Sequence, residues 1–314
     1  MARPGTRILG FGAAQPAEAI SSAQIGARYG RTAAWIEART GIRTLRRLRS
    51  DESLADLANS AALQALSQAD LAGSEIDTVI GATCSIASGD PLVSRTLSER
   101  IAPGAAYFDL NAACSGFCYG ASAADALIRS GSARNVLLVG AERMSSIIDP
   151  DDLGTGIIFG DGAGAVVFGP SATGQPAIGP VAWGSDGGQS GLISFGDGSY
   201  MRMQGQQVFR WAVEKIHDVA SKACLLAGLT MDDIDIFVPH QANLRIGTAI
   251  ADRLGLRQAI VSTDITVSGN TSAASIPIAL ARLVQSGRAR SGQLALLVGF
   301  GAGLTYAAQV IRLP

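Results

Sequence analysis

The chain has 314 residues, 47% of them hydrophobic and 38 of them glycine, which is typical of a compact α/β protein and excludes a disordered or fibrous one. Its formal net charge of −1 excludes an overall field that would draw nucleic acid or an anionic membrane surface. Four cysteines without CxxC spacing and only two histidines argue against a metal site and against a disulfide framework.

Residues 1–12 lack the long apolar core of a signal peptide and read as the beginning of a strand. No segment reaches the roughly 20 consecutive apolar residues that a membrane-spanning helix needs. We therefore expect a cytoplasmic protein without a membrane or nucleic-acid partner.

The first third of the chain alternates strand and helix patterns. Ile8 to Ala13 is predicted as a short buried strand, and Ser53 as the cap of a helix whose apolar residues recur at helical spacing. Between them, the basic segment 32–49 has the composition of a solvated loop with a turn at Gly41.

The alternation continues with predicted strands at 76–82 and 135–140, and a helix of small residues between them. Cys114 lies at or just before the first turn of that helix. Segment 160–168 resembles a glycine-rich phosphate loop, but the residues after it alternate like a strand, so Gly162 and Gly164 are interpreted as packing glycines. The series predicts a layered α/β fold.

An internal repeat divides the chain. Segment 71–77 resembles 229–235 at a shift of 158 positions, 130–134 resembles 286–290 at 156, and 137–140 resembles 296–299 at 159. These collinear matches predict two copies of one α/β half, residues 1–172 and residues 173–314.

The repeat brings three polar residues together. A shift of 156 positions pairs Cys114 with Asn270, so both are expected on equivalent turns that meet at the pseudo-twofold axis. His240 follows an apolar strand, at the edge where ligands bind in open α/β sheets. A lone histidine or cysteine is more often structural, but their convergence with Asn270 favours catalysis.

These residue types suit one chemistry. A cysteine can accept an acyl group as a thioester, and a helix N-terminus favours its thiolate. A neutral histidine and an asparagine amide donate hydrogen bonds that stabilise an enolate. Backbone N–H groups of Cys114 and of the last glycine loop, 299–303, are candidates for an oxyanion hole. The set predicts acyl transfer followed by carbon–carbon condensation. Papain-type proteolysis also uses Cys, His and Asn, but its local cysteine signature is missing.

Six collinear segments resemble the β-ketoacyl-acyl carrier protein synthases III of the thiolase superfamily. They are WIEARTGIR from Trp35, AACSGF around Cys114, GDGAGA from Gly160, VPHQANLRI around His240, GNTSAAS around Asn270 and GFGAG from Gly299. VPHQANLRI together with GNTSAAS at this spacing is highly specific for the family.

The resemblance implies a five-layered α-β-α-β-α thiolase-like fold and a homodimer that needs no cofactor or metal. Cys114 takes an acyl primer from an acyl-CoA, and His240 with Asn270 assists decarboxylation of malonyl-acyl carrier protein. The carbanion attacks the Cys114 thioester and gives a 3-oxoacyl-acyl carrier protein and CO₂. The N–H groups of Cys114 and Ala302 hold the thioester oxygen.

The resemblance also assigns a set of substrate-binding positions. Trp35 and Arg39 match residues that contact the CoA nucleotide, and Arg210 is a candidate contact for the acidic carrier protein. The remaining members, which line or flank the pantetheine tunnel, are Gly205, Phe209, Ala242, Asn243 and Arg245.

Two departures from the family pattern bear on the primer and its donor. Leu153 stands where many members have an arginine that closes over the adenine of CoA, so a carrier-protein donor is also compatible. Segment 87–91 is small and polar where some members have a bulky aromatic residue that limits the acyl pocket. We therefore expect primers larger than acetyl.

The sequence gives less support to three other functions. An acyltransferase that passes the Cys114 acyl group to an oxygen or nitrogen nucleophile is the nearest alternative, but Asn270 beside His240 favours enolate chemistry. A thiolase needs a second cysteine in the last glycine loop, which has none. A non-catalytic acyl-binding subunit does not need the intact trio. Fatty-acid initiation and polyketide starter-unit formation both fit the sequence.

Overall fold

A computed structural model describes residues 5–87, 89–171, 176–195 and 200–314, and it contains two five-stranded mixed sheets of matching topology. The first has the order β1 (Thr6–Ala14), β7 (Asp161–Pro170), β6 (Val136–Arg143), β4 (Thr78–Ala82), β5 (Ala106–Leu110). The second has the order β8 (Ala182–Ser185), β14 (Thr305–Arg312), β13 (Leu294–Phe300), β11 (Ile236–Pro239), β12 (Ile260–Val261). In each sheet the last three strands are parallel and the first two are antiparallel to their neighbours.

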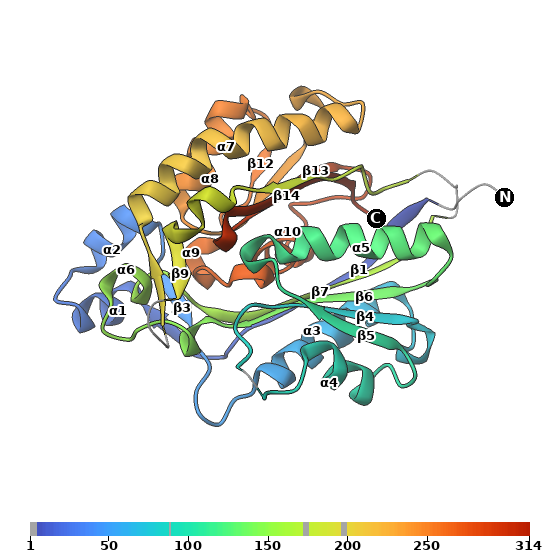
Figure 1. Ribbon diagram of the computed structural model, residues 1–314, viewed down its shortest axis with the longest axis horizontal. Helices are drawn as coiled ribbons and strands as arrows, with labels where there is room; N and C mark the ends of the chain where they lie inside the picture. The colour runs from blue at the N-terminus through green and yellow to red at the C-terminus, as the bar shows by residue number, and fades with distance from the viewer. Residues whose placement is uncertain (1–4, 88, 172–175, 196–199) are drawn as a thin grey trace.

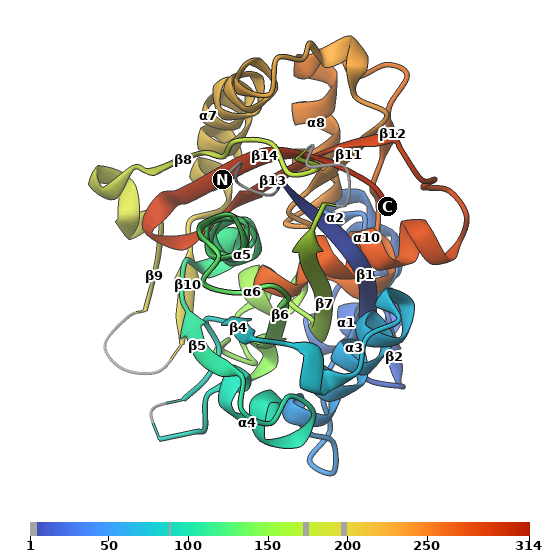
Figure 2. The same ribbon diagram turned by 90° about the vertical axis from the view of Figure 1, so that its right-hand side faces the viewer.

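The sheets lie between three layers of helices (Figures 1 and 2). Helices α5 (Gly116–Ser130) and α10 (Ser275–Gln285) fill the space between the sheets. Helices α3 (Leu54–Ala69) and α4 (Val93–Arg100) cover the outer face of the first sheet, and α7 (Gly205–Leu226) and α8 (Leu244–Leu254) that of the second. This arrangement confirms the expected five-layered α-β-α-β-α fold.

The central layer is packed from small and apolar side chains. Phe117 and Ala121 of α5 and Ile276 and Leu280 of α10 are almost fully buried, between strands such as the one that carries Leu138. Removing this much apolar surface from water fixes the two sheets on the same pair of helices. The N-termini of α5 and α10 are thereby held rigidly in the interior.

The prediction of a solvated loop at 32–49 is wrong. Thr32 caps helix α2 (Ala33–Thr40) by accepting from the Trp35 N–H group, and Gly41 ends it with a left-handed φ of 77°. Strand β3 (Thr44–Arg46) follows and pairs with β2 (Ala19–Ser21), which leads into α1 (Ser22–Arg28). The charged composition hid an amphipathic helix whose buried residue Ile36 joins a small core cluster.

Several short helices and strands lie near the C-terminal ends of the parallel strands. They are α6 (Leu153–Gly156), β9 (Ile193–Phe195), β10 (Met201–Met203) and α9 (Ile265–Ser268). Within the described ranges, no helix is long and apolar enough to cross a membrane.

The two sheets bear out the duplication, but the repeat has a different register from the one expected. α5 has 15 residues and α10 has 11, so the second helix is about one turn shorter and the shift changes inside it. At the first residues of the two helices, Gly116 and Ser275, the shift between equivalent positions is 159 and not the expected 156. The proposed division at 172/173 falls in 172–175, which lies outside the described residues.

Candidate active site

Cys114 lies on a tight turn between β5 and α5. The Asn111 side-chain oxygen accepts from the Ala113 N–H at 3.0 Å, and Ala113 has a left-handed φ of 47°. A short 3₁₀ turn, Ala113–Ser115, then leads directly into the helix. The turn places Cys114 at the helix N-terminus, as the sequence predicted.

Asn270 begins the equivalent turn of the second half. Its side-chain oxygen accepts from the Ser272 N–H at 2.9 Å, and Ser272 has a φ of 48°. The counterpart of Asn270 is therefore Asn111, and that of Cys114 is Ala273. The predicted pairing of Cys114 with Asn270 was wrong by three residues, although the two turns are equivalent and pack together.

The backbone of Asn270 is held by the segment that leads into β7. Its backbone N–H donates to Ile158 at 2.9 Å and its carbonyl accepts from Gly160 at 3.0 Å. Because Ser272 occupies the side-chain oxygen, the remaining donor is the NH₂ group. Asn270 is one of the residues that line the cavity beside Cys114.

His240 follows β11, and its backbone N–H donates to Val298 at 2.7 Å. Its Nδ1 atom lies 2.8 Å from the Ser275 hydroxyl, which itself accepts from the Gln241 N–H at 3.3 Å. Because the Ser275 oxygen already accepts, it is suited to donate to Nδ1, and Nε2–H becomes the donor toward the cavity. Burial lowers the pKa of His240 to about 3, so the imidazole is neutral near pH 7.

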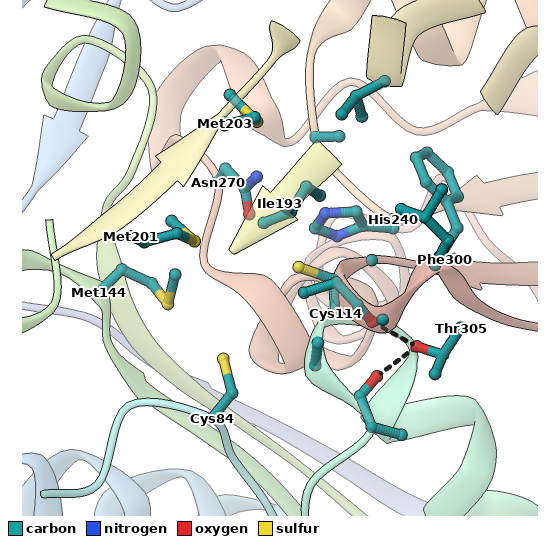
Figure 3. A pocket seen from close by; sticks show the side chains of 18 of the residues that line it. Cys84, Cys114, Met144, Ile193, Met201, Met203, His240, Asn270, Phe300 and Thr305 are labelled. Carbon is teal, nitrogen blue, oxygen red and sulfur yellow. Dashed lines mark hydrogen bonds between the residues drawn. The ribbon is translucent and has the colours of Figure 1, made fainter. Parts of the chain in front are cut away.

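Cys114, His240 and Asn270 meet in one cavity of about 360 Å³. Figure 3 shows the Cys114 sulfur facing His240 and Asn270, with Met144, Met201 and Cys84 on the opposite wall. Other apolar residues that line the cavity are Ile147, Phe159, Ile193, Phe195, Met203, Val208, Trp211 and Phe300. Sequence reasoning did not identify this wall, because its residues come from segments that are far apart in the chain.

The last glycine loop packs against the cysteine turn. A Cβ atom on Gly301 would lie 2.7 Å from the Cys114 nitrogen, so only glycine leaves that N–H accessible. The Thr305 hydroxyl lies 2.8 Å from that of Ser115 and bonds the carbonyl groups of Ala112 and Ala302 at 3.0 and 3.1 Å. Thr305, a residue that sequence reasoning missed, thus fixes Ala302 beside Cys114.

The surroundings of Cys114 oppose the thiolate that the helix N-terminus favours. Burial raises the pKa of Cys114 to about 12, although a hydrogen bond from Ser272 favours the charged form. With this pKa, Cys114 carries its proton near neutral pH.

This pKa has a measurable consequence. Since thiolate is the form that alkylates, the rate of Cys114 modification by iodoacetamide is expected to rise about tenfold per pH unit between pH 6 and 9. Mass mapping identifies the labelled cysteine, and Cys114→Ala is the control for background labelling. A rate that levels off near neutral pH would contradict the raised pKa.

A second cavity of about 540 Å³ adjoins the first and shares Met203, Val208, Ala242 and Asn270 with it. The structure places most of the predicted substrate-binding residues on its wall. These are Arg39, Gly205, Phe209, Ala242, Asn243 and Arg245. The Asn243 side chain also caps α8 and donates to the Arg39 carbonyl at 3.1 Å, which fastens α2 to α8.

Trp35 lies outside both cavity linings and is stacked with two guanidinium groups. Arg31 and Arg39 lie 5.0 and 4.3 Å from its ring centroid. Leu153, at the position of the expected adenine-contacting arginine, packs in the same apolar cluster as Trp35. The guanidinium groups of Arg31 and Arg39 therefore already contact the Trp35 indole ring.

The loop expected to limit the acyl pocket lies at the surface of this chain. Gly89, Asp90 and Pro91 are exposed, and Ser88 lies outside the described residues. Cys84, just before this loop, does line the cavity. Within the parts of the chain that are described, no cluster of three or more His, Cys, Asp or Glu residues could hold a metal ion.

The chain is similar to known proteins over almost its whole length. A family model described as 3-oxoacyl-[acyl-carrier-protein] synthase III matches residues 108–187, and one for its C-terminal part matches residues 224–313. β-Ketoacyl-[acyl-carrier-protein] synthase III of Mycobacteroides abscessus is 42% identical, covering 98% of this chain and 94% of the relative.

Solved structures extend the likeness to three dimensions. The priming β-ketosynthase of the R1128 polyketide biosynthetic pathway superposes with a TM-score of 0.96 at 41% identity, covering 99% of this chain and 97% of that one. 3-Oxoacyl-[acyl-carrier-protein] synthase III of Aquifex aeolicus superposes with a TM-score of 0.93 at 35% identity, covering 98% and 100%. The chain belongs to the β-ketoacyl-[acyl-carrier-protein] synthase III family of the thiolase superfamily.

Proposed function

We propose that this protein condenses an acyl primer, carried as a thioester on Cys114, with the malonyl group of malonyl-acyl carrier protein. The observation that carries the proposal is the meeting of Cys114, a neutral His240 and Asn270 in one apolar cavity. The names of its relatives support this reaction in fatty-acid initiation or in polyketide starter-unit formation.

In the first half-reaction, the Cys114 sulfur attacks the carbonyl carbon of an acyl-CoA. The carbonyl oxygen takes up negative charge and accepts from the N–H groups of Cys114 and Ala302. When the tetrahedral intermediate collapses, the bond to the CoA sulfur breaks. The leaving CoA sulfur takes the proton of the Cys114 thiol, so CoA departs as a free thiol. The acyl chain then lies against the apolar wall of the cavity.

In the second half-reaction, the malonyl thioester oxygen accepts from Nε2–H of His240 and the NH₂ group of Asn270. The carbon–carboxylate bond breaks, CO₂ leaves, and its electron pair forms an enolate stabilised by these two donors. The enolate carbon attacks the Cys114 thioester, the bond to the Cys114 sulfur breaks, and the released thiolate takes a proton from solvent. Because loss of CO₂ supplies the carbanion, this chemistry needs no metal or organic cofactor.

The adjoining second cavity is proposed as the pantetheine tunnel, and its mouth as the site for CoA and the carrier protein. Arg39, Arg210 and Arg245 line it, and Arg245 lies 5.8 Å from the Phe209 ring centroid. Cations at a tunnel mouth attract both the phosphates of CoA and an acidic carrier protein. Trp35, between Arg31 and Arg39, is proposed to contact the nucleotide.

A homodimer is proposed from the free edge of the first sheet. β5 is an edge strand in this chain, and Tyr107 and Phe108 on it are 45% and 39% exposed. An exposed apolar edge strand is a natural pairing surface. In such a dimer the surface loop at 89–91 is available to the partner's pocket, and its lack of a bulky aromatic supports a primer larger than acetyl.

The test is a product assay with purified protein, a panel of acyl-CoAs and malonyl-acyl carrier protein. Mass spectrometry of the carrier protein is expected to show the 3-oxoacyl product, and CO₂ is expected in equal amount. Primers larger than acetyl are expected to react at least as well as acetyl. Acylation of Cys114 without CO₂ would instead favour an acyltransferase that passes the group to oxygen or nitrogen, and a strict preference for acetyl would exclude the larger primers.

A further inference from the structure

A buried carboxylate lies directly behind the active site and takes no part in the mechanism above. Glu142, the penultimate residue of β6, has 0% of its surface exposed. Among the described residues no basic side chain forms an ion pair with it. Burying a carboxylate without a cation is costly, so the fold must provide compensating donors.

The donors come from both halves of the molecule. From the first half, the Thr83 hydroxyl donates to Oε2 at 3.1 Å, the Cys84 N–H donates at 3.1 Å, and the Ser85 hydroxyl also donates to Oε2. From the second half, the Ala273 N–H donates to Oε1 at 3.3 Å. Glu142 is thus a junction between the loop after β4 and the turn that begins at Asn270.

The internal repeat shows which residue of the second half corresponds to Glu142. At the shift of 159, Ala273 is the counterpart of Cys114, and Gly301 is the counterpart of Glu142. In the reactive turn, Gly301 leaves the space beside the Cys114 N–H open. In the other turn, the side chain of Glu142 fills the equivalent space and its oxygen accepts from the Ala273 N–H.

We infer that Glu142 is a positioning residue for Asn270. The Glu142 carboxylate occupies the place in the second half that corresponds to the proposed oxyanion hole beside Cys114, and it locks the turn 270–274. Asn270 orients its amide through the Ser272 N–H, and Ser272 has a left-handed φ that a free serine disfavours. The bond from Ala273 to Glu142 holds the next peptide of that turn. This role rests on the proposed function, because it acts on the decarboxylation half-reaction.

The buried setting of Glu142 agrees with this role. Desolvation raises the pKa of its carboxyl group, while the hydrogen bonds from Ser85 and Cys84 lower it again. Its replacement by glutamine keeps the shape but turns an NH₂ group toward the Thr83, Cys84 and Ser85 donors. The N–H of the new glutamine then faces the N–H of Cys84, so this hydrogen bond is lost and the contact between the two halves weakens.

The test measures the two half-reactions of Glu142→Gln separately. Cys114 acylation, followed by intact mass, is expected to stay within about twofold, whereas CO₂ release from malonyl-acyl carrier protein is expected to fall about tenfold. In an Asn270→Ala background, Glu142→Gln is expected to cause no further fall, because it acts through Asn270. Fully additive losses, or equal losses in both half-reactions, would overturn the role.

Asp161→Asn is the matched control. Asp161 lies on the neighbouring strand, is also 0% exposed, and accepts from Leu48 and Ser145 N–H groups instead. It is expected to lower the melting temperature without a selective loss of CO₂ release; the same selective loss there would overturn the assignment to Glu142.

A milder variant serves if Glu142→Gln does not fold. Thr83→Val removes one donor to Glu142 and is expected to lower CO₂ release about threefold, again only while Asn270 is present. An equal loss in the Asn270→Ala background would overturn the role. A wild-type protein that released no CO₂ would refute the proposed function itself, which separates the two failures.

Discussion

Replacing Cys114 with alanine is expected to abolish the acyl-enzyme and to lower condensation by on the order of 10⁴-fold or more, because no other group can carry the primer. Cys84 lines the same cavity, but burial and the carboxylate of Glu142 raise its pKa well above that of a free thiol. Intact mass after incubation with acyl-CoA measures the loss directly.

The matched control is Cys118→Ala. Cys118 lies one helical turn further on, is fully buried and packs in the central core. Its replacement is expected to change stability while leaving the acyl adduct intact. An adduct that survives Cys114→Ala, or disappears only with Cys118→Ala, would contradict the choice of nucleophile.

His240→Ala and Asn270→Ala are each expected to lower CO₂ release by about 10² to 10³-fold while Cys114 still becomes acylated. In the proposed mechanism both residues donate to the enolate oxygen, whereas the backbone N–H groups of Cys114 and Ala302 hold the thioester oxygen. Separate assays of adduct formation and CO₂ release distinguish the two steps.

The control for these two variants is Ser275→Ala, which removes the hydroxyl that bonds Nδ1 of His240 at 2.8 Å. It is expected to give a smaller loss in the same half-reaction, because the imidazole loses its orienting partner but keeps Nε2. Loss of acylation in both His240→Ala and Asn270→Ala would contradict the division of roles.

Much of the fold was accessible from the sequence, because strands, caps and repeats leave local patterns. The strand that begins near Ile8 and the helix capped by Ser53 were predicted with nearly the observed bounds. The segment 32–49 was not, since its charges masked one short buried face on α2. The predicted register of the repeat was wrong because α10 is shorter than α5, and no local sequence pattern indicates this difference in length.

The polar trio was predictable because each member follows a recognisable strand or turn and the repeat relates two of those turns. The residues that support it were not, since their contacts join segments far apart in the chain. Thr305 bonds Ala112 across 193 positions, and Glu142 bonds Ala273 across 131. The raised pKa of Cys114 is likewise a property of the closed cavity and not of the local sequence.

The most direct test of the central claim is one single-turnover measurement on the wild-type protein. The enzyme is first loaded with an acyl-CoA, and intact mass is followed with CO₂ release after malonyl-acyl carrier protein is added. The Cys114 adduct is expected to disappear at the rate at which CO₂ and 3-oxoacyl-acyl carrier protein appear, in equal amounts. An adduct that persists while CO₂ is released, or that disappears without it, would contradict decarboxylative condensation on Cys114.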